Sequence, residues 1–420
     1  MTTISDLPCD LVGEILSRVP LTSLGATRST CKKWEALSKN QIFGKKSRAA
    51  ARKQFLGFMM KDARVCSLKF DLQGIRNHGD LVDPSINQVS LLNQVEVHRV
   101  FHCDGLLLCV LKDSSRLLVW NPYLGQTRWI EPRQNFDVLD RYAIGYDKKN
   151  RNHKILRIFG EQRTVLGYEI YDFSSNSWRV VCVEPPEWFI WSHQRSVSLK
   201  GNAFFAAKRE TTTVVGGGGK KIIEQDILLC FDFTTERFGP SLYLPFCSDA
   251  KDNVTLSCLR DEQLAVLHQH MNACQIMEIW VTTKIDPDTV SWNKFMRELA
   301  GYPVDTEGGS FFIDEEKNVA VVFDLDHFHG AMASAHMVGP RRYLRSVKIG
   351  KALNIGKLDE LGYFHAKYRL PLVCSSYVPS LVQLQINQPG CQKRKRERVY
   401  KPKSKMKEEQ REKNGGIEVY

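Results

Sequence analysis

A strand–turn–strand pattern with an aromatic residue on its returning strand recurs four times in the middle of the chain. The four copies are VWNPYLGQTRW, IYDFSSNSWRVV, CFDFTTERFGP and IWVTTKIDPDTVSW. Their second aromatic residues are spaced by 178−129=49, 238−178=60 and 292−238=54 residues, at Trp129, Trp178, Phe238 and Trp292. A period near ~50 residues is typical of β-propeller blades, although the diglycine of a kelch blade is missing. Because paired aromatic residues also flank turns in β-sandwiches, another all-β fold stays open beside the propeller-like, kelch-like one.

Runs rich in β-branched and aromatic residues, bounded by turn residues, continue through the chain after about residue 54. Examples are VCSLKFDL from Val65, GLLLCVLKD from Gly105, HKILRIFG from His153 and NVAVVFDLD from Asn318. Such runs predict strands, and no long helical periodicity interrupts them. We therefore predict a large all-β domain over residues 61–386. The stretch TTTVVGGGGKK from Thr211 is predicted to be a flexible loop between two of its strands.

The first 45 residues have helical periodicity instead. Leu11, Val12, Ile15 and Leu16 fall on one helical face, and Pro20 ends that pattern. A second periodic set contains Leu24, Cys31 and Trp34. About 40 residues are too few to bury a self-sufficient core. We predict an α+β multidomain chain with a helical module at 1–45, a linker at 46–60, the all-β domain at 61–386 and a tail at 387–420.

Composition restricts the class of protein. Of 420 residues, 43% are hydrophobic and 25% are charged, which is typical of a globular protein. The sequence has no run of 18 apolar residues and no secretory signal, so we expect no membrane association and reduced intracellular thiols. The 30 residues from Cys391 carry 11 Lys+Arg and 5 Asp+Glu, or 11−5=+6 of the total +12. This tail has too few apolar residues to fold and is predicted to be disordered.

Motifs of catalysis and metal binding are missing. The sequence around Gly219-Lys220 has Val214 and Lys221 where a phosphate-binding loop needs glycine and Ser/Thr. The stretch DLDHFHG (Asp324, Asp326, His327 and His329) is interpreted as a solvated turn, because strand alternation would scatter its ligands. We predict no cofactor, no metal and no catalytic residue. The pattern favours a binding protein over an enzyme built on a propeller.

Two further segments are candidate binding sites. The loop VEPPEWFIWSHQ places three aromatic residues together, which either contact a target protein or pack inside a blade: Trp188, Phe189 and Trp191. The tail contains a basic run that fits a nuclear-import signal, a solvated tail or a nucleic-acid contact: Lys393, Arg394, Lys395 and Arg396. Specific nucleic-acid binding usually needs interleaved aromatic residues, and Tyr400 alone gives little support, so we do not expect it as the main activity.

The stretch LPCDLVGEILSRVPLTSLGATRSTCKKWEAL, from Leu7 to Leu37, resembles an F-box. The matching features are Leu-Pro at the start, apolar residues in the first helix, a proline, Ser-Leu, and Cys-Lys-x-Trp at the end. The resemblance implies docking on a Skp-family adaptor. The set that it assigns to adaptor contact or to packing of the module is Leu7, Pro8, Leu11, Ile15, Leu16, Pro20, Leu24, Cys31 and Trp34.

The following domain resembles the F-box-associated domain, type 1, of plant F-box proteins. The segments FHCDGLLLCVL, LLVWNPYLGQTRWI, YEIYDFSSNSWRVV and LLCFDFTTERFGPSLYLPF carry the resemblance, and they occur in the family's order. Together the two resemblances imply a non-catalytic subunit that recruits an unidentified target protein to a cullin-based ubiquitin ligase, in the nucleus, the cytoplasm or both. The alternative is a nuclear nucleic-acid-binding protein that acts through its basic tail.

Overall fold

The structure is a computed structural model of the 420-residue chain. It describes most of residues 55–384, with shorter gaps and with longer ones at 71–83, 182–185, 271–275, 300–303, 305–308, 327–331, 359–363 and 366–371. Before residue 55 it describes Pro8, Leu11, Val12, Ile15, Leu16, Thr27, Thr30 and residues 31–38. The basic run Lys393–Arg396 and the rest of the tail lie outside the described residues, as do Leu7, Pro20 and Leu24.

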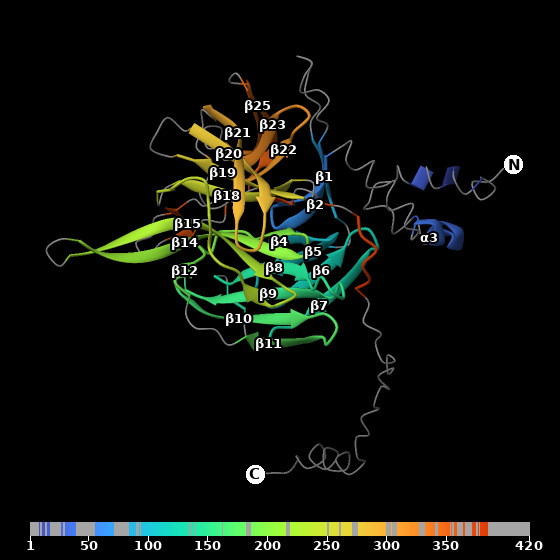
Figure 1. Ribbon diagram of the computed structural model, residues 1–420. Coiled ribbons are helices and arrows are strands. Elements are labelled where there is room, and N and C mark those ends of the chain that lie inside the picture. Colours follow the sequence, from blue (N-terminus) through green and yellow to red (C-terminus); the bar gives the residue numbers. More distant parts are fainter. Residues whose placement is uncertain are drawn as a thin grey trace, which may run out of the picture. The chain divides into compact units, whose positions relative to one another are not determined.

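Six antiparallel sheets follow one another along the chain (Figure 1). In the first three, the strand order is β28-β1-β2-β3, β4-β5-β6-β7 and β11-β10-β9-β8. Their strands are β28 (Leu372–Cys374), β1 (Phe55–Lys61), β2 (Arg64–Phe70), β3 (Ser85–Gln88), β4 (Val97–Cys103), β5 (Leu106–Leu111), β6 (Leu117–Asn121), β7 (Gln126–Ile130), β8 (Arg141–Tyr146), β9 (His153–Gly160), β10 (Val165–Asp172) and β11 (Ser177–Val181).

The fourth sheet contains six strands, and the fifth and sixth contain four each. Their strands are β12 (Trp188–Phe189), β13 (Val197–Leu199), β14 (Asn202–Val215), β15 (Gly219–Asp232), β16 (Arg237–Phe238), β17 (Leu242–Tyr243), β18 (Asn253–Leu259), β19 (Gln263–Gln269), β20 (Ile276–Ile285), β21 (Val290–Leu299), β22 (Ser310–Asp314), β23 (Val319–Asp326), β24 (Met332–Gly339) and β25 (Tyr343–Lys351). A separate small hairpin pairs β26 (Lys357–Leu358) with β27 (Phe364–His365).

The six sheets are the blades of a closed ring. Each sheet has one strand that lies next to a strand of the following sheet. These strands contact one another in the cyclic order β28, β4, β8, β13, β18, β22 and back to β28. In Figure 1 the orange strands of the sixth blade return beside the blue strands of the first. The strand β28 pairs with β1, so that Val373 lies opposite Met59 and the two ends of the domain share one blade. The fold is therefore a six-bladed β-propeller.

Hydrophobic cores lie between neighbouring blades, one for each of the six junctions. The core between blades one and two, for example, contains Phe58 and Trp120, whose rings are 5.2 Å apart edge to face. Because most blades are covered on both faces, inner strands such as β5 are buried at every residue instead of at alternate ones. This explains why the sequence shows continuous apolar runs such as LLLCVL.

A buried ionic network lies within the third blade. The Arg157 guanidinium donates from Nε to Oδ2 of Asp140 and from Nη1 to Oε1 of Glu169, at 2.7 Å in both cases. All three side chains are buried. Burial disfavours the charged form of Arg157, but the hydrogen bond to Glu169 and the charge of Asp140 outweigh it and raise the pKa of Arg157.

The sequence repeat corresponds to the last hairpin of blades two to five. Trp129, Trp178, Phe238 and Trp292 lie on β7, β11, β16 and β21. At the start of the first three turns a side-chain oxygen accepts a backbone N–H two or three residues later, in Asn121, Asp172 and Asp232. Four residues after each of these, the backbone has a positive φ of 68°, 54° and 56°, at Gly125, Asn176 and Glu236. Each turn thus repeats one local conformation.

The fold prediction is confirmed for the described residues: a helical N-terminal region precedes a large all-β, propeller-like domain. The blade number, which the sequence left open, is six. Two local predictions are wrong. Strands β14 and β15 run through Val215 and resume at Gly219, so most of the predicted glycine loop is strand. Asp324 is fully buried within β23 and not in a solvated turn, because the run of apolar residues before it extends the strand.

The N-terminal region is helical at Leu11–Val12 and Ile15–Leu16 and in α3 (Lys32–Ser38). The Val12 N–H donates to the Pro8 carbonyl at 3.1 Å, which is a helical hydrogen bond four residues long. Pro8 tolerates this position because it has no N–H to leave unpaired. Within the part of the chain that the structure describes, no helix combines the length and the apolar character of a membrane span.

Candidate functional site

The helical module presents two apolar residues to solvent. Leu11 is 51% exposed and Ile15, one helical turn later, is 44% exposed. Residues four apart share one helical face, so these two side chains form a small apolar surface. Val12 and Leu16, on the neighbouring positions, are buried, and Trp34 is partly buried against them. Of the set proposed for the adaptor, Pro8 is exposed and Cys31 is half-buried.

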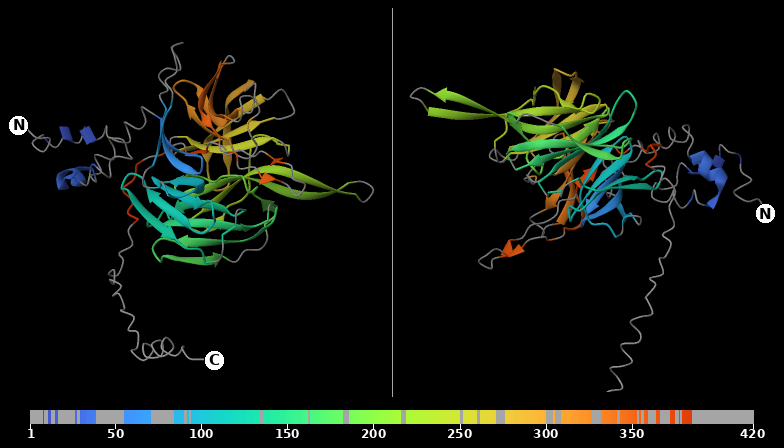
Figure 2. Two further views of the ribbon diagram at one scale, coloured as in Figure 1. Left: turned by 180° about the vertical axis from the view of Figure 1, so that it is seen from behind. Right: turned by 90° about the horizontal axis from the view of Figure 1, so that it is seen from below.

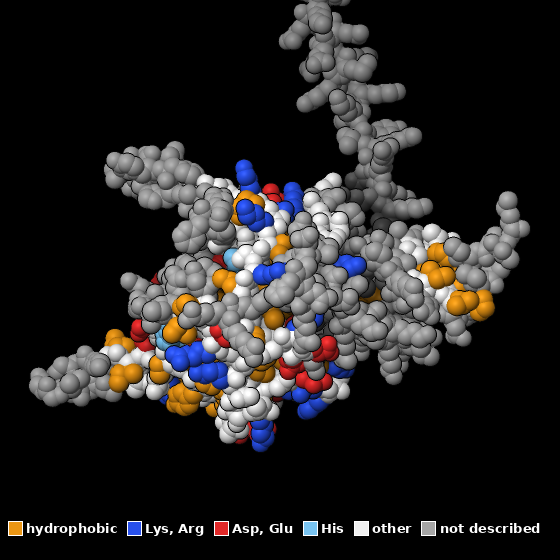
Figure 3. Space-filling model, turned by 90° about the horizontal axis from the view of Figure 1, so that it is seen from above, with side chains coloured by type: hydrophobic (Ala, Val, Ile, Leu, Met, Phe, Trp, Pro, Cys, Tyr) orange, Lys and Arg blue, Asp and Glu red, His pale blue; other side chains and the backbone are white. Residues whose placement is uncertain are grey.

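A second surface surrounds the projecting hairpin of the fourth blade. Strands β14 and β15 pair from Ala203↔Phe231 out to Val215↔Gly219, and this hairpin extends well beyond the rest of its sheet (Figures 1 and 2). Hydrophobic side chains are exposed along it (Figure 3), and Ile222 and Ile223 are 61% and 39% exposed. Large exposed apolar side chains on a projecting element are typical of a binding surface.

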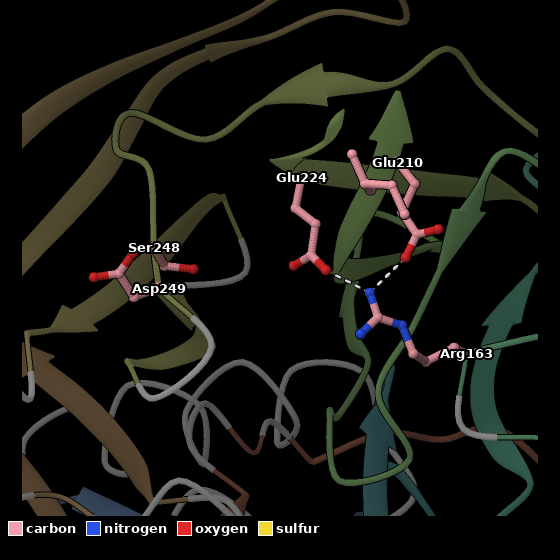
Figure 4. Close-up of a pocket in the computed structure, with 6 residues that line it drawn as sticks. Arg163, Glu210, Glu224, Ser248 and Asp249 are labelled. Atoms are coloured by element: carbon pink, nitrogen blue, oxygen red, sulfur yellow. Dashed lines mark hydrogen bonds and ion pairs between the residues drawn. The ribbon is translucent and has the colours of Figure 1, made fainter. Parts of the chain in front are cut away.

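A pocket lies at the base of this hairpin (Figure 4). Its volume is about 660 Å³, and its lining residues are Arg163, Glu210, Ile222, Glu224, Ser248 and Asp249. They come from the turn between β9 and β10 in the third blade, from the hairpin of the fourth blade, and from the connection between the fourth and fifth blades that precedes β18. A volume of this size falls within the range of ligand pockets in proteins, which is roughly 300–1,000 Å³.

Charge in the pocket is centred on Arg163. Its Nη2 donates to a carboxylate oxygen of both Glu210 and Glu224, and these hydrogen bonds raise the pKa of Arg163 (Figure 4). Asp249 lies on the opposite side of the pocket, beside Ser248 (Figure 4). The lining therefore carries three carboxylates against one guanidinium, beside the exposed Ile222.

The aromatic residues that the sequence singled out lie beside this pocket. The Arg163 guanidinium lies over the rings of Phe189 and Trp191, with its central carbon 4.6 Å and 5.4 Å from their centroids. Phe189 is buried, Trp191 is half-buried, and Trp188 packs against Phe238 with ring centroids 4.7 Å apart. Phe189 is thus buried, whereas Trp188 and Trp191 are both half-buried and both pack against neighbouring rings, Trp191 against Phe189 with centroids 5.1 Å apart.

A buried polar network fixes the far wall of the pocket. The Lys208 ammonium lies 2.9 Å from Asp226 Oδ1 and donates to the Ser248 carbonyl and hydroxyl, at 2.8 Å each. Ser248 in turn donates its N–H and hydroxyl to the two oxygens of Asp226. Because Lys208 and Asp226 are both buried, these bonds are shielded from water and hold the 248–249 segment in place.

Two histidines and one aspartate converge behind that wall. Asp252 Oδ2 lies 3.0 Å from His268 Nε2 and 3.2 Å from His270 Nδ1. Burial lowers the pKa of His268, although the hydrogen bond to Asp252 opposes this effect. Among the described residues, these three form the group whose ligand atoms are close enough together to hold a metal ion.

The sequence analysis did not identify Asp252, His268 and His270 as a possible metal site. The two histidines are visible as the HQH that ends the strand-like run LAVLHQH, and their spacing of two is a signal for ligands on one strand face. Asp252, 268−252=16 residues earlier, carries no such signal. Of the DLDHFHG residues that the sequence considered for metal binding, His327 and His329 lie outside the described residues.

Comparisons with known proteins assign both parts of the chain. Residues 4–46 match the F-box domain, and residues 56–384 match the F-box associated beta propeller domain. An F-box/kelch-repeat protein of Arabidopsis thaliana is 61% identical over 94% of this chain and 99% of its own length. A putative F-box protein of the same plant is 54% identical, over 91% of this chain and all of its own length. The chain belongs to the family of F-box proteins with an F-box-associated β-propeller domain.

Proposed function

We propose that this protein is the substrate receptor of an SCF-type ubiquitin ligase, in which a Skp-family adaptor links the F-box to a cullin. The observation that carries the proposal is the combination of an F-box with a six-bladed propeller in one chain. In this function the chain performs no bond chemistry. It raises the effective concentration of the target's lysines near a ubiquitin-charged enzyme.

The adaptor binds the apolar face that carries Leu11 and Ile15. Both side chains are about half exposed on a helical segment too short to be stable alone, so a partner that covers them gains buried apolar area. Exposed apolar residues four apart are the anchors that a groove on another protein recognises.

The target binds the surface formed by the β14–β15 hairpin and the pocket at its base. Support comes from the exposed Ile222 and Ile223 and from the charged lining around Arg163. An interface of this kind combines apolar anchors with a polar rim. The surface lies on the propeller, so target binding and adaptor binding use different parts of the chain.

Co-purification with a plant Skp-family adaptor tests the docking half. The double variant Leu11→Asp with Ile15→Asp is expected to lose the adaptor, since each buried anchor contributes roughly 2 kcal/mol or more. The matched control is Leu166→Asp, which changes a leucine that is 68% exposed on β10 of the propeller. Equal recovery of the adaptor with both variants would contradict the proposal that Leu11 and Ile15 bind it.

Proximity labelling tests the target half. Proteins labelled by the full chain are compared with those labelled by a Glu210→Lys, Glu224→Lys variant, which reverses the charges that face Arg163. The side chains of Arg163, Glu210 and Glu224 are 47%, 38% and 30% exposed. Loss of the ion pairs between them therefore costs little stability. The expected result is a set of proteins that disappears in the variant while the adaptor stays bound. An unchanged set would rule out this pocket as the target site.

A further inference from the structure

We propose that Asp252, His268 and His270 form a binding site for a divalent transition-metal ion, with Zn²⁺ as the expected occupant. Their three ligand atoms lie within 4.8 Å of one another, and Asp252 Oδ2 is 3.0 Å and 3.2 Å from the two imidazole nitrogens. Two ligands of a tetrahedral zinc ion at ~2.0–2.1 Å are separated by roughly 3.4 Å. The two separations from Asp252 Oδ2 are close to that value, and within the 4.8 Å limit of the group the imidazole rings can adjust to complete the site.

The local backbone explains why the two histidines point the same way. His268 lies in β19 and His270 directly follows this strand, where its N–H donates to the Ile276 carbonyl of β20 and continues the ladder. Residues two apart in an extended strand share one face. The His268 ring is stacked on Phe246, with ring centroids 4.1 Å apart, which fixes its orientation.

Asp252 is held in position by its own turn. Its N–H donates to the Asp249 carbonyl, and its Oδ2 accepts the Asp249 N–H, at 3.1 Å in each case. The same oxygen faces both imidazole nitrogens. One backbone N–H and two imidazole nitrogens therefore lie within 3.2 Å of this single oxygen. A neutral imidazole nitrogen can present a lone pair, so a cation between this oxygen and the two rings would be bound by all three groups.

The chemical types of the three ligands and their burial indicate which class of metal ion would bind. The side chains of His268 and Asp252 are 0% and 1% exposed, whereas His270 is 39% exposed. Two ligands are thus shielded and the third opens to solvent, which leaves a coordination position for water, as in zinc sites with three protein ligands. Two imidazoles and one carboxylate suit Zn²⁺ and its transition-metal neighbours, whereas Ca²⁺ and Mg²⁺ prefer oxygen ligands alone.

The ion would connect the pocket wall to the sheet. Ser248 and Asp249 line the pocket, and Asp249 is hydrogen-bonded to Asp252 on both sides of their turn. Coordination of Asp252 to the two histidines of β19 would anchor this turn. The inference goes beyond the proposed function and does not depend on it, because metal binding is measured on the protein alone.

The test is a calorimetric titration of ZnCl₂ into the full-length protein after chelator treatment and dialysis. We expect one tightly bound ion per chain, and an affinity reduced at least about tenfold in His270→Gln and in Asp252→Asn. His270→Gln changes a partly exposed side chain and keeps the fold even if Asp252→Asn does not. The matched control is His193→Gln, a half-buried histidine outside the group, which should bind as the wild type does.

Cobalt separates this site from the cysteines, of which Cys247 is exposed nearby in sequence. With Co²⁺ in place of zinc, the proposed ligands give d–d absorption without thiolate-to-cobalt charge transfer. Loss of the d–d bands in His270→Gln, with retention in His193→Gln, would support the site. The proposal is overturned if the wild type binds no ion, if His270→Gln binds as tightly as the wild type, or if a thiolate band shows that cysteines hold the metal.

Discussion

At the scale of single residues, buried charges of the propeller occur in partnered groups. Arg157 joins two buried carboxylates, from Asp140 before β8 and from Glu169 on β10. Replacing one member of such a group leaves the others charged in a medium that solvates them poorly. These residues therefore matter more for stability than surface ion pairs of similar geometry.

We predict that Arg157→Leu lowers the free energy of unfolding by about 3–5 kcal/mol, because Asp140 and Glu169 lose their main partner. Urea denaturation followed by tryptophan fluorescence measures the change. The control is Arg133→Leu, whose side chain is 48% exposed and lies 3.7 Å from Glu169, and whose loss should cost under about 1 kcal/mol. Similar losses in both variants would contradict the prediction.

Two turn aspartates make stability depend on pH. Partial burial opposes ionisation of Asp172 and Asp232, but hydrogen bonds from the residues that follow them outweigh it and lower both pKa values. A carboxylate with a lowered pKa stabilises the folded state above its unfolded pKa of about 3.9, and this contribution is lost as the pH falls through the folded value. Acid should therefore weaken these turns.

We predict that Asp172→Asn with Asp232→Asn flattens the dependence of unfolding free energy on pH between about pH 5 and pH 3. Asparagine can keep the turn, because Asn121 makes the same hydrogen bond in the second blade. Urea midpoints measured across this pH range check the prediction. A slope identical to that of the wild type would show that the two carboxylates do not contribute.

At the scale of elements, the hairpin β14–β15 differs from the other strand pairs. Its outer part, from Thr212↔Ile222 to Val215↔Gly219, pairs only with itself among the described residues. Neighbouring strands cover only its inner part, where β12 reaches Arg209 and β17 reaches Ile227. The outer hairpin therefore contributes little to the propeller cores and is available for binding.

We predict that replacing residues 212–222 by Asn-Gly leaves thermal stability and adaptor binding nearly unchanged but removes target capture. The replacement joins the paired residues Thr211 and Ile223 through a two-residue turn that suits a hairpin. Differential scanning calorimetry, adaptor co-purification and proximity labelling give the three measurements. A large fall in melting temperature would mean that the outer hairpin supports the fold.

Sequence reasoning succeeded where the signal is local. Strands such as β5 and β9 are bounded by turn residues, and the aromatic repeat correctly marked the last hairpins of four blades. It failed where partners are distant in sequence. The pairing of Met59 with Val373 spans 373−59=314 residues, and the pocket combines side chains from two blades and an inter-blade connection. Neither leaves a pattern that a single stretch of sequence can show.

At the scale of the whole molecule, ring closure depends on a three-residue strand. Strand β28 completes the first blade, and Val373 and Cys374 are buried in the cores on its two sides. Without β28, strand β1 has an unpaired edge at the centre of the ring. Exposed edges of this kind favour aggregation.

We predict that a chain ending at residue 371 aggregates or unfolds at a lower denaturant concentration, whereas a chain ending at residue 384 unfolds cooperatively. The second chain keeps β28 and corresponds to the compact unit Met1–Leu384. Size-exclusion chromatography and urea denaturation compare the two. Equal behaviour would show that β28 is dispensable for closure.

The shared first blade also has a consequence during translation. At ~5–20 residues per second, ribosomes need some tens of seconds to proceed from β1 to β28. The F-box is complete long before the receptor domain can close, so the ring stays open in the meantime. A gene truncated by a late stop codon would still encode the F-box. If that F-box docks as proposed, its product would occupy adaptors without delivering a target and would act as a dominant inhibitor of the intact receptor.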